Sequence, residues 1–189
     1  EIDLTKKFKR KSFLGLIKEA TGYDLKNLDK NEIQNVCSNN NIEIGSDINE
    51  GQMLDKLMSE IIEPTLIEPT FVIDYPKLIS PLAKSHRRGD KNIVERFELF
   101  IGSSEFSNSF TELNDPIDQR ERLQAQARLK ELGDEEAQPV DENFIQAMEC
   151  GMPPTGGVGI GIDRLIMLLT GNRWIKDVIL FPTLKQESP

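Results

Sequence analysis

A strand of alternating glycines leads directly into an apolar helix over residues 155–170. From Gly157 to Gly161 every second residue is a glycine, and the residues between them are branched and apolar. Because successive side chains of a strand point to opposite faces, one face carries apolar side chains and the other is bare backbone. A flat ligand can lie against such a face. The pattern therefore predicts a strand–helix unit with an open ligand-binding face.

Asp163 and Arg164 stand where this strand meets the helix. Aspartate is a common helix N-cap, so we expect Asp163 to cap the helix. Arg164 then lies in the first turn, where free N–H groups and the helix dipole favour an anion and a guanidinium can grip phosphate. The spacing differs from the Walker and dinucleotide fingerprints. The alternative is a core strand followed by an ordinary cap and a surface charge.

The totals are those of a globular chain of 189 residues, 38% hydrophobic and 29% charged, which fits one large domain or a domain with a small appendage. No apolar run has bilayer-spanning length and no signal-peptide pattern is present, so we expect a cytoplasmic protein without membrane contact. Cys37 and Cys150 lie far apart, and we expect both to stay reduced.

The net charge of −9 argues against a surface wholly devoted to nucleic acid. The basic run at 6–11 is interpreted as a solvated edge, with a local nucleic-acid contact as the alternative.

Hydrophobic spacing and breaker residues divide the chain into helices and strands. Helices are predicted near residues 12–21, 29–38, 50–63, 116–132 and 142–150. Gly22, Pro64 and Gly133 should end the first, third and fourth of these helices, Asp29 should open the second, and Asp141 should cap the fifth. Strands are predicted near residues 69–75, 93–101, 105–113, 155–161 and 178–181, the last closing the sheet. The first three helices form a helical subregion at about 12–63. This order indicates an α+β fold with a mainly antiparallel sheet flanked by helices.

Three polar residues interrupt the apolar strands of the predicted hairpin at 93–113. With a turn at 102–104, position 98 falls opposite 108, so Glu98, Asn108 and Glu112 project from one sheet face. Acids are rarely buried without partners, and this face suits a hydrated Mg²⁺ or a ligand with an ammonium group. The alternative is a sheet with one wet side, on which the acids face water or pair with Arg96 and lysines.

Glu105 has the opposite parity in the same hairpin. In a regular strand its side chain points away from the face that carries Asn108, unless the strand bulges between the two residues. The position of Glu105 is therefore a test of the predicted hairpin.

Six segments occur in a fixed order along the second half of the chain. They are Arg96–Gly102, Phe110–Pro116, Gly133–Ala137, Asp141–Phe144, Gly151–Pro154 and the glycine strand with Asp163 and Arg164. Together they resemble lysyl-tRNA synthetase of class II, and the likeness extends from about Pro69 to Pro182. Ile2–Ile17 is similar to the stretch after the family's second signature motif. The resemblance implies that residues 1–189 are the carboxy-terminal portion of an incomplete class II catalytic core, with two signature motifs and an anticodon-binding β-barrel before Glu1.

The resemblance implies four contacts to the nucleotide. Arg164 matches the arginine of the third signature motif, a catalytic residue that contacts the ATP triphosphate. Gly159 would leave room for the nucleotide beside the strand. Glu98 and Glu105 match ATP-binding positions whose carboxylates hold Mg²⁺ on the phosphates.

The resemblance also implies three contacts to lysine. Asn108 matches a residue that contacts the amino acid, Glu112 matches the acid that receives the ε-ammonium, and Gly161 would leave room. Glu112 would supply selectivity, because a neutral amino acid of similar length leaves a buried carboxylate unpaired, which costs roughly a hundredfold in discrimination.

The implied activity is that of a lysine-tRNA ligase, which uses ATP to convert L-lysine to lysyl-adenylate and transfers the lysyl group to tRNA(Lys). The complete enzyme would be a homodimer. Residues 1–189 alone are expected to be inactive, and the partial sheet should expose unpaired edges and apolar surface. Two alternatives stay open: a paralogue that ligates lysine to a protein, and a noncatalytic module that binds a nucleotide or amino acid or serves structure only.

Overall fold

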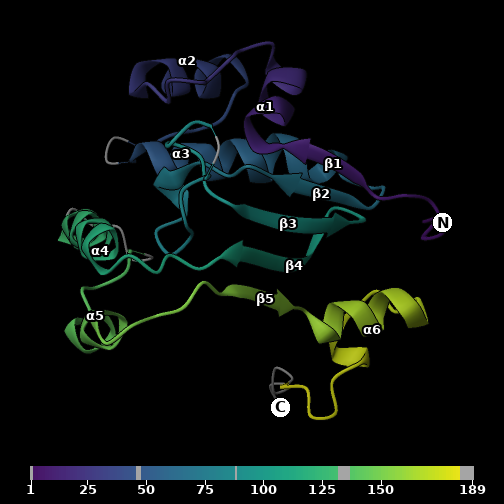
Figure 1. Cartoon of the computed structure of the whole chain (residues 1–189). Coiled ribbons are helices and arrows are strands. Elements are labelled where there is room, and N and C mark those ends of the chain that lie inside the picture. The colour runs from purple at the N-terminus through teal and green to yellow at the C-terminus, as the bar shows by residue number, and fades with distance from the viewer. Residues whose placement is uncertain (1, 46–47, 88, 132–136, 184–189) are drawn as a thin grey trace, which may run out of the picture.

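One sheet lies at the centre of the computed structural model, which describes residues 2–45, 48–87, 89–131 and 137–183 (Figure 1). The strand order is β1-β2-β3-β4-β5, with β1 and β2 parallel and every other neighbouring pair antiparallel. This confirms the predicted α+β fold with a mainly antiparallel sheet. The strands are β1 (Lys9–Ser12), β2 (Thr70–Ile73), β3 (Arg96–Ile101), β4 (Ser104–Thr111) and β5 (Gly156–Ile160).

The helices flank this sheet, with α1, α2 and α3 gathered on the β1–β2 side and α6 beyond β5 (Figure 1). The predicted caps Asp29 and Asp141 are confirmed, because each carboxylate accepts hydrogen bonds from N–H groups of the first helical turn. Gly22 ends α1 in the left-handed region, as predicted, while Gly133 lies outside the described residues. The helices are α1 (Phe13–Thr21), α2 (Lys30–Asn39), α3 (Glu50–Leu57), α4 (Pro116–Glu131), α5 (Glu142–Glu149) and α6 (Ile162–Thr170).

The helix predicted at 50–63 consists of three kinds of helix in succession. α3 continues as a π-helical turn at Met58–Ile62 and then as a 3₁₀ turn at Glu63–Thr65. Pro64 lacks the N–H that the next helical bond requires, so the helix stops here, as predicted. Single π-helical turns are frequent at functional sites. In this chain the turn is followed by Glu63, which lines a cavity shared with the sheet.

The main core lies between the first three helices and one face of the sheet. Phe13 of α1 and Leu54 of α3 are fully buried in the same cluster as Val72 and Phe100 of the sheet. Val72 pairs with Glu98, and Phe100 lies two residues further along the same strand, so all three project from one face. The helical region therefore covers the sheet face that carries the candidate acid Glu98.

The turn of the β3–β4 hairpin is one residue shorter than predicted. Gly102 and Ser103 form it, with φ of 57° and 62°, the left-handed region that a type I′ hairpin turn requires. Serine rarely adopts this conformation, but here the Ser103 N–H donates to the Leu66 carbonyl and its hydroxyl donates to the Pro64 carbonyl. These bonds to the preceding segment stabilise the turn.

The β4 strand also contains a β-bulge, which is the condition under which Glu105 and Asn108 can lie on the same sheet face. The register shifts between Leu99 and Phe100, where Phe106 is the extra residue of β4. The shorter turn and the bulge offset one another in the register. Glu98 therefore pairs with Asn108, as predicted.

Two predictions near the end of the chain are wrong. Gly161, not Asp163, is the N-cap of α6, and Asp163 lies in the first turn, where its charge still favours the helix dipole. Residues 178–181 form turns and bends instead of a closing strand. Leu180 and Phe181 are 89% and 91% exposed. An apolar run becomes a strand only where a partner strand satisfies its backbone, and none lies beside this one within the described residues.

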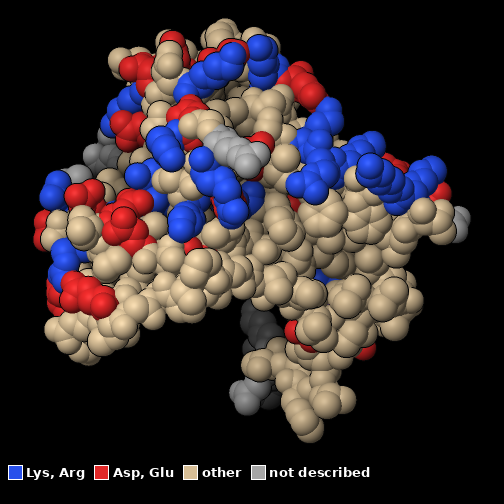
Figure 2. Space-filling model, viewed as in Figure 1, with Lys and Arg blue, Asp and Glu red and all other residues tan. Residues whose placement is uncertain are grey.

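The two edge strands of the sheet differ in surface character. Lys and Arg side chains gather along β1, whereas the surface around β5 and α6 is largely uncharged (Figure 2). Val158 and Ile160 of β5 are 64% and 56% exposed, and α6 contains no buried residue. The expected exposure of apolar surface at an unpaired edge is thus confirmed. No helix in the described ranges is both long and apolar enough to span a bilayer.

Candidate active site

Two of the candidate residues, Glu98 and Glu105, lie on the sheet face beneath the π-helical turn. A cavity of about 420 Å³ lies there, between that turn and the sheet. Its lining comes from separate parts of the chain that only the fold brings together. Among the polar residues that line it are Glu63, Tyr75, Arg96, Glu98 and Glu105.

Glu98 is buried and has a partner for each carboxylate oxygen. The Tyr75 hydroxyl donates to Oε2 at 2.6 Å, and Arg96 Nη2 donates to Oε1 at 2.6 Å. Arg96 Nε also donates to Oδ1 of Asn108 at 3.2 Å. Burial, followed by the charge of Glu98, raises the pKa of Tyr75 well above its usual value, so the phenol remains a donor. The Glu98 carboxylate is therefore fixed in orientation before any ligand binds.

The pairing of Glu98 with Arg96 agrees with one part of the alternative interpretation of this sheet face. The other part, an acid facing water, is wrong for Glu98, which is only 9% exposed. A buried ion pair requires further hydrogen bonds to offset the loss of hydration. Tyr75 and Asn108 supply such bonds here.

Arg164 contacts Glu105, one of the residues that line this cavity. The two-residue turn places Glu105 opposite Phe100, on the face of Glu98, and the bulge brings Asn108 to the same face. Arg164 Nη1 donates to the backbone carbonyl of Glu105 and lies 3.9 Å from Oε2 of its carboxylate. Burial, then repulsion from Glu98, raises the pKa of Glu105, while Arg164 opposes the rise. Arg164 thus lies beside Glu105, and Glu105 lies close enough to Glu98 to be repelled by its charge, while the roles of all three toward a ligand stay predictions.

Glu98 and Glu105 are the side chains that could hold a divalent cation at this place. Mg²⁺ in nucleotide sites takes one or two carboxylates and completes its shell with water and phosphate oxygens. Over the described stretches, no three or more His, Cys, Asp or Glu side chains gather as a metal-ligand cluster. A cation bound here would complete its shell with oxygens from water or from a bound phosphate. A pair of mutually repelling carboxylates fits Mg²⁺ carried on a nucleotide.

Glu112 differs from Glu98 because nothing in the described part of the chain pairs with its carboxylate. Burial raises the pKa of Glu112, which means that the charged form has lost hydration without gaining a partner. The carboxylate lies over Gly157 of β5, where an added Cβ would stand 2.1 Å from Oε1. Gly157 pairs with Phe110, two residues from Glu112 on β4. The glycine thus provides the space that the acid occupies.

Gly159 and Gly161 leave open space instead. An added Cβ would lie 3.8 Å from the Asn108 carbonyl at Gly159 and 3.6 Å from the Phe106 carbonyl at Gly161, which are ordinary contacts. Packing within the described chain therefore does not require glycine at either position. Gly159 pairs with Asn108, so its bare face adjoins the candidate amino-acid site. Whether a ligand uses this space stays a prediction.

Three residues of the site were absent from the sequence-based predictions of its ligand contacts: Glu63, Tyr75 and Gly157. Arg96 was considered only as a charge partner, although its spacing of two from Glu98 on one strand places both side chains on one face. No local pattern indicated Glu63 or Tyr75, because both reach the cavity through the packing of the helical region against the sheet.

Comparison with known proteins defines the class to which this fold and site belong. The family model of class II tRNA synthetases (D, K and N) matches residues 1–185, and the chain belongs to this family. A five-stranded, mainly antiparallel sheet with flanking helices agrees with that assignment.

Several curated relatives are named more narrowly, as lysine–tRNA ligase. The chain is 50% identical over 188 residues to the protein of Leuconostoc mesenteroides, covering 99% of this chain and 38% of that protein. It is 52% identical to the protein of Prochlorococcus marinus subsp. pastoris over 98% of this chain and 37% of that protein. The protein of Porphyromonas gingivalis is 46% identical over 98% of this chain and 32% of its own length. The chain thus spans about two fifths or less of the relatives it matches.

Proposed function

We propose that this chain forms part of the catalytic domain of a lysine–tRNA ligase, with residues 12–63 as a helical subregion over the site. The observation that carries the proposal is Glu112, an acid partly removed from water and without a partner in the described structure. It lies on the sheet face of Glu98, beside a glycine strand that ends at Arg164. An ammonium group would satisfy Glu112, and a nucleotide phosphate would satisfy Arg164. The names of the relatives support lysine as the amino acid.

In the first step, a carboxylate oxygen of lysine attacks the α-phosphorus of ATP, and pyrophosphate leaves as lysyl-adenylate forms. Neither reactant needs to lose a proton to a protein base, so positioning and charge stabilisation carry the rate. Arg164 would contact the triphosphate, whose charge its guanidinium can accept in two directions. Mg²⁺ held by Glu98 and Glu105 would neutralise charge on the phosphates. Gly159 would admit the nucleotide beside β5.

Selection of lysine would depend on the other end of the sheet face. Glu112 would receive the ε-ammonium, Asn108 would contact the amino acid, and Gly161 would leave room for it. The matching family model includes synthetases for aspartate and asparagine as well as lysine. An aspartate side chain would face the Glu112 carboxylate with a like charge, and asparagine would leave it without a counter-ion. Glu112 therefore favours lysine among the three.

In the second step, the terminal ribose hydroxyl of tRNA(Lys) would take the lysyl group from the adenylate. We propose a cytoplasmic homodimer as the working form of the full-length protein. Residues 1–189 alone are expected to lack activity, because β5 and α6 leave apolar surface uncovered at the end of the site that carries Arg164.

The test uses the full-length natural chain that contains this sequence. We expect ATP–pyrophosphate exchange that depends on lysine and Mg²⁺, and transfer of labelled lysine to tRNA(Lys). Aspartate and asparagine at the same concentration serve as matched controls and should give no exchange. Exchange that is as fast with aspartate or asparagine as with lysine would overturn the proposal. Lysine activation without any transfer to tRNA would favour the paralogue that ligates lysine to a protein.

A further inference from the structure

Arg96 contacts both halves of the candidate site with one guanidinium. Nη2 donates to Glu98 Oε1 at 2.6 Å, and Nε donates to Asn108 Oδ1 at 3.2 Å. The third nitrogen, Nη1, donates at 2.9 Å to both the Ile79 carbonyl and the Ser80 hydroxyl. Because the guanidinium is planar and rigid, these bonds fix the relative positions of the Glu98 carboxylate and the Asn108 amide.

Tyr75 restrains the same pair from a second direction. The Arg96 guanidinium carbon lies 4.6 Å from the centroid of the Tyr75 ring, a cation–π contact. The Tyr75 hydroxyl donates to the other oxygen of Glu98. Tyr75 thus touches Glu98 and Arg96, but none of its side-chain contacts in the described structure reaches Asn108. This difference separates the contributions of Tyr75 and Arg96.

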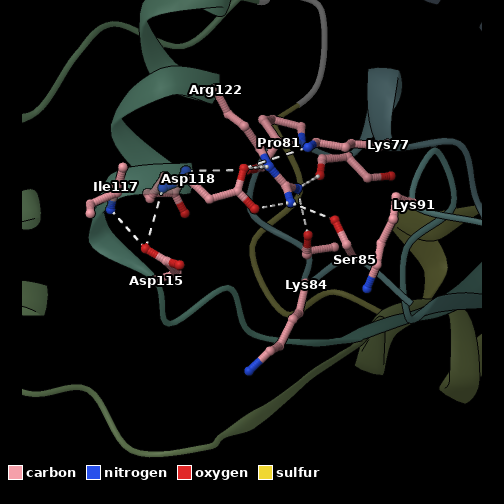
Figure 3. Close-up of polar contacts among 12 residues, drawn as sticks. Lys77, Pro81, Lys84, Ser85, Lys91, Asp115, Ile117, Asp118 and Arg122 are labelled. Carbon is pink, nitrogen blue, oxygen red and sulfur yellow. Dashed lines mark hydrogen bonds and ion pairs between the residues drawn. The ribbon is translucent and has the colours of Figure 1, made fainter. Parts of the chain in front are cut away.

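The loop that accepts the Arg96 bonds is also held by Arg122 of α4, which points toward Pro81 and Ser85 (Figure 3). Arg122 donates to the Ala83 carbonyl at 2.6 Å, to the Ser80 carbonyl at 3.4 Å and to the Ser85 hydroxyl at 3.0 Å. Asp118 holds Arg122 with two bonds of 2.7 and 2.8 Å. Ser80 is therefore held between two arginines, one on α4 and one on β3. Buried polar networks with complete bonding are rigid.

We propose that Arg96 is a positioning residue that sets the Glu98 carboxylate and the Asn108 amide in one arrangement, and so couples the nucleotide half of the site to the amino-acid half. This inference rests on the proposed function, since it takes Glu98 as a residue of the Mg²⁺–ATP site and Asn108 as a residue of the lysine site. Each carboxylate oxygen accepts more than one bond, so Glu98 retains capacity for a cation while Arg96 and Tyr75 hold it.

The experiment measures binding instead of turnover, in the full-length natural chain. Thermal-shift titrations with lysine alone and with Mg²⁺–ATP alone give separate affinities. Arg96→Lys keeps the charge but cannot bond Glu98, Asn108 and Ser80 together, so both affinities should fall by about tenfold. Tyr75→Phe removes one bond to Glu98 only, so the Mg²⁺–ATP affinity should fall by about threefold and the lysine affinity should stay unchanged.

Arg87→Lys is the matched control. Arg87 forms the same kind of ion pair, with two bonds of 2.7 Å to Glu95, but its side chain is 70% exposed and does not line the cavity. Both affinities should be unchanged in this variant. A folded Arg96→Lys variant with unchanged affinities would overturn the inference, as would Tyr75→Phe weakening lysine as much as Mg²⁺–ATP.

Ser80→Ala keeps the inference testable if Arg96→Lys does not fold. It removes the hydroxyl that accepts from Arg96 and leaves Glu98 and Asn108 intact, so both affinities should fall together by about twofold. A lower melting temperature with both affinities unchanged would overturn the inference. Absence of any stabilisation by lysine in the unmodified protein would overturn the proposed function and this inference together. Normal binding by the unmodified protein with an unaffected Arg96→Lys variant would overturn the inference alone.

Discussion

Glu98 and Glu112 lie on the same face of one sheet but in opposite electrostatic settings. Glu98 is 9% exposed and receives hydrogen bonds from Tyr75 and Arg96. The Glu112 carboxylate has no hydrogen bond or ion pair with any described residue, and burial raises its pKa. The chain itself stabilises the charge of Glu98, whereas the charge of Glu112 costs free energy until something else stabilises it.

The difference between Glu98 and Glu112 indicates that the two carboxylates have different roles in the site. A carboxylate that is held by its own chain offers a fixed geometry, as a cation on a nucleotide requires. A carboxylate without a partner gains the most when a cationic ligand arrives, because the ligand restores the interaction that hydration once provided. Glu112, whose carboxylate has no partner among the described residues, should therefore determine which amino acid binds. Glu98, whose carboxylate is held by Tyr75 and Arg96, should determine how well the phosphates are placed.

The largest expected effect comes from Glu112→Gln. The glutamine amide cannot neutralise an ammonium group, so the kcat/KM for lysine in ATP–pyrophosphate exchange should fall about a hundredfold or more. Affinity for Mg²⁺–ATP alone should be unchanged, which a thermal-shift titration measures. The matched control is Glu121→Gln, a substitution at an exposed position on α4. A decrease in lysine activation of less than threefold in Glu112→Gln would contradict the assigned role.

Substitutions of two glycines on one strand face should separate the two halves of the site. Gly157→Ala places a methyl group 2.1 Å from the present position of Glu112 Oε1, so the carboxylate must move. We expect the kcat/KM for lysine to fall by about tenfold, because a displacement of about 1 Å in a positioned group can cost up to about a hundredfold. Gly159→Ala clears the chain at 3.8 Å and should instead raise the KM for ATP. If both variants altered the kinetic constants for lysine and for ATP to the same extent, the two glycines would not belong to different halves of the site.

The sequence predicted the pairing of Glu98 with Asn108, although by two errors that offset one another. Ser104 was assigned to the turn, and the strand was assumed to be regular, whereas the turn contains only Gly102 and Ser103 and the strand bulges at Phe106. Alternation along the sequence shows which sheet face a side chain occupies only when the strand is regular. The sequence could therefore show only that a bulge is required if Glu105 is to share a face with Asn108.

Other features depended on contacts between distant segments. The partnering of Glu98 by Tyr75 joins residues 23 positions apart, and no local pattern predicts it. The run at 178–181 has strand-like composition but has no strand to pair with in the described structure, which is why that prediction was wrong. Local caps at Asp29 and Asp141 were predictable because each acts within its own helical turn.

Lysine binding should also depend on pH through Glu112. Because burial raises the pKa of Glu112 above 4.5, its carboxylate takes up a proton at a higher pH than an exposed glutamate does. Lysine binds the ionised form, so its affinity should fall as the pH is lowered from about 8 toward the raised pKa of Glu112. Titrations of lysine affinity across this range measure the effect. The dependence should disappear in Glu112→Gln and persist in Glu95→Gln, because Arg87 lowers the pKa of Glu95 to about 2.

The smallest expected effect concerns Glu63, which shares the cavity with Glu98 but lacks its bonding. Burial, then repulsion by Glu98 and Glu105, raises the pKa of Glu63 above 4.5. The folded state therefore favours the protonated form, and the ionised carboxylate lowers stability as pH rises through this raised pKa. Glu63→Gln should raise the melting temperature at about pH 7 by on the order of 1–3 °C.

The pH dependence of this gain distinguishes charge repulsion from altered packing. Below about pH 4 wild-type Glu63 is protonated in both the folded and unfolded states, so the gain from Glu63→Gln should vanish there. Glu98→Gln should instead lower the melting temperature at about pH 7, because the amide disrupts the bonds with Tyr75 and Arg96 and leaves the half-buried Arg96 guanidinium without its counter-ion. Scanning calorimetry of both variants at the two pH values measures this. The distinction would fail if the higher melting temperature of Glu63→Gln persisted at low pH, or if both variants changed the melting temperature in the same direction. Glu98 would then not differ from Glu63 in being stabilised by hydrogen bonds from its own chain.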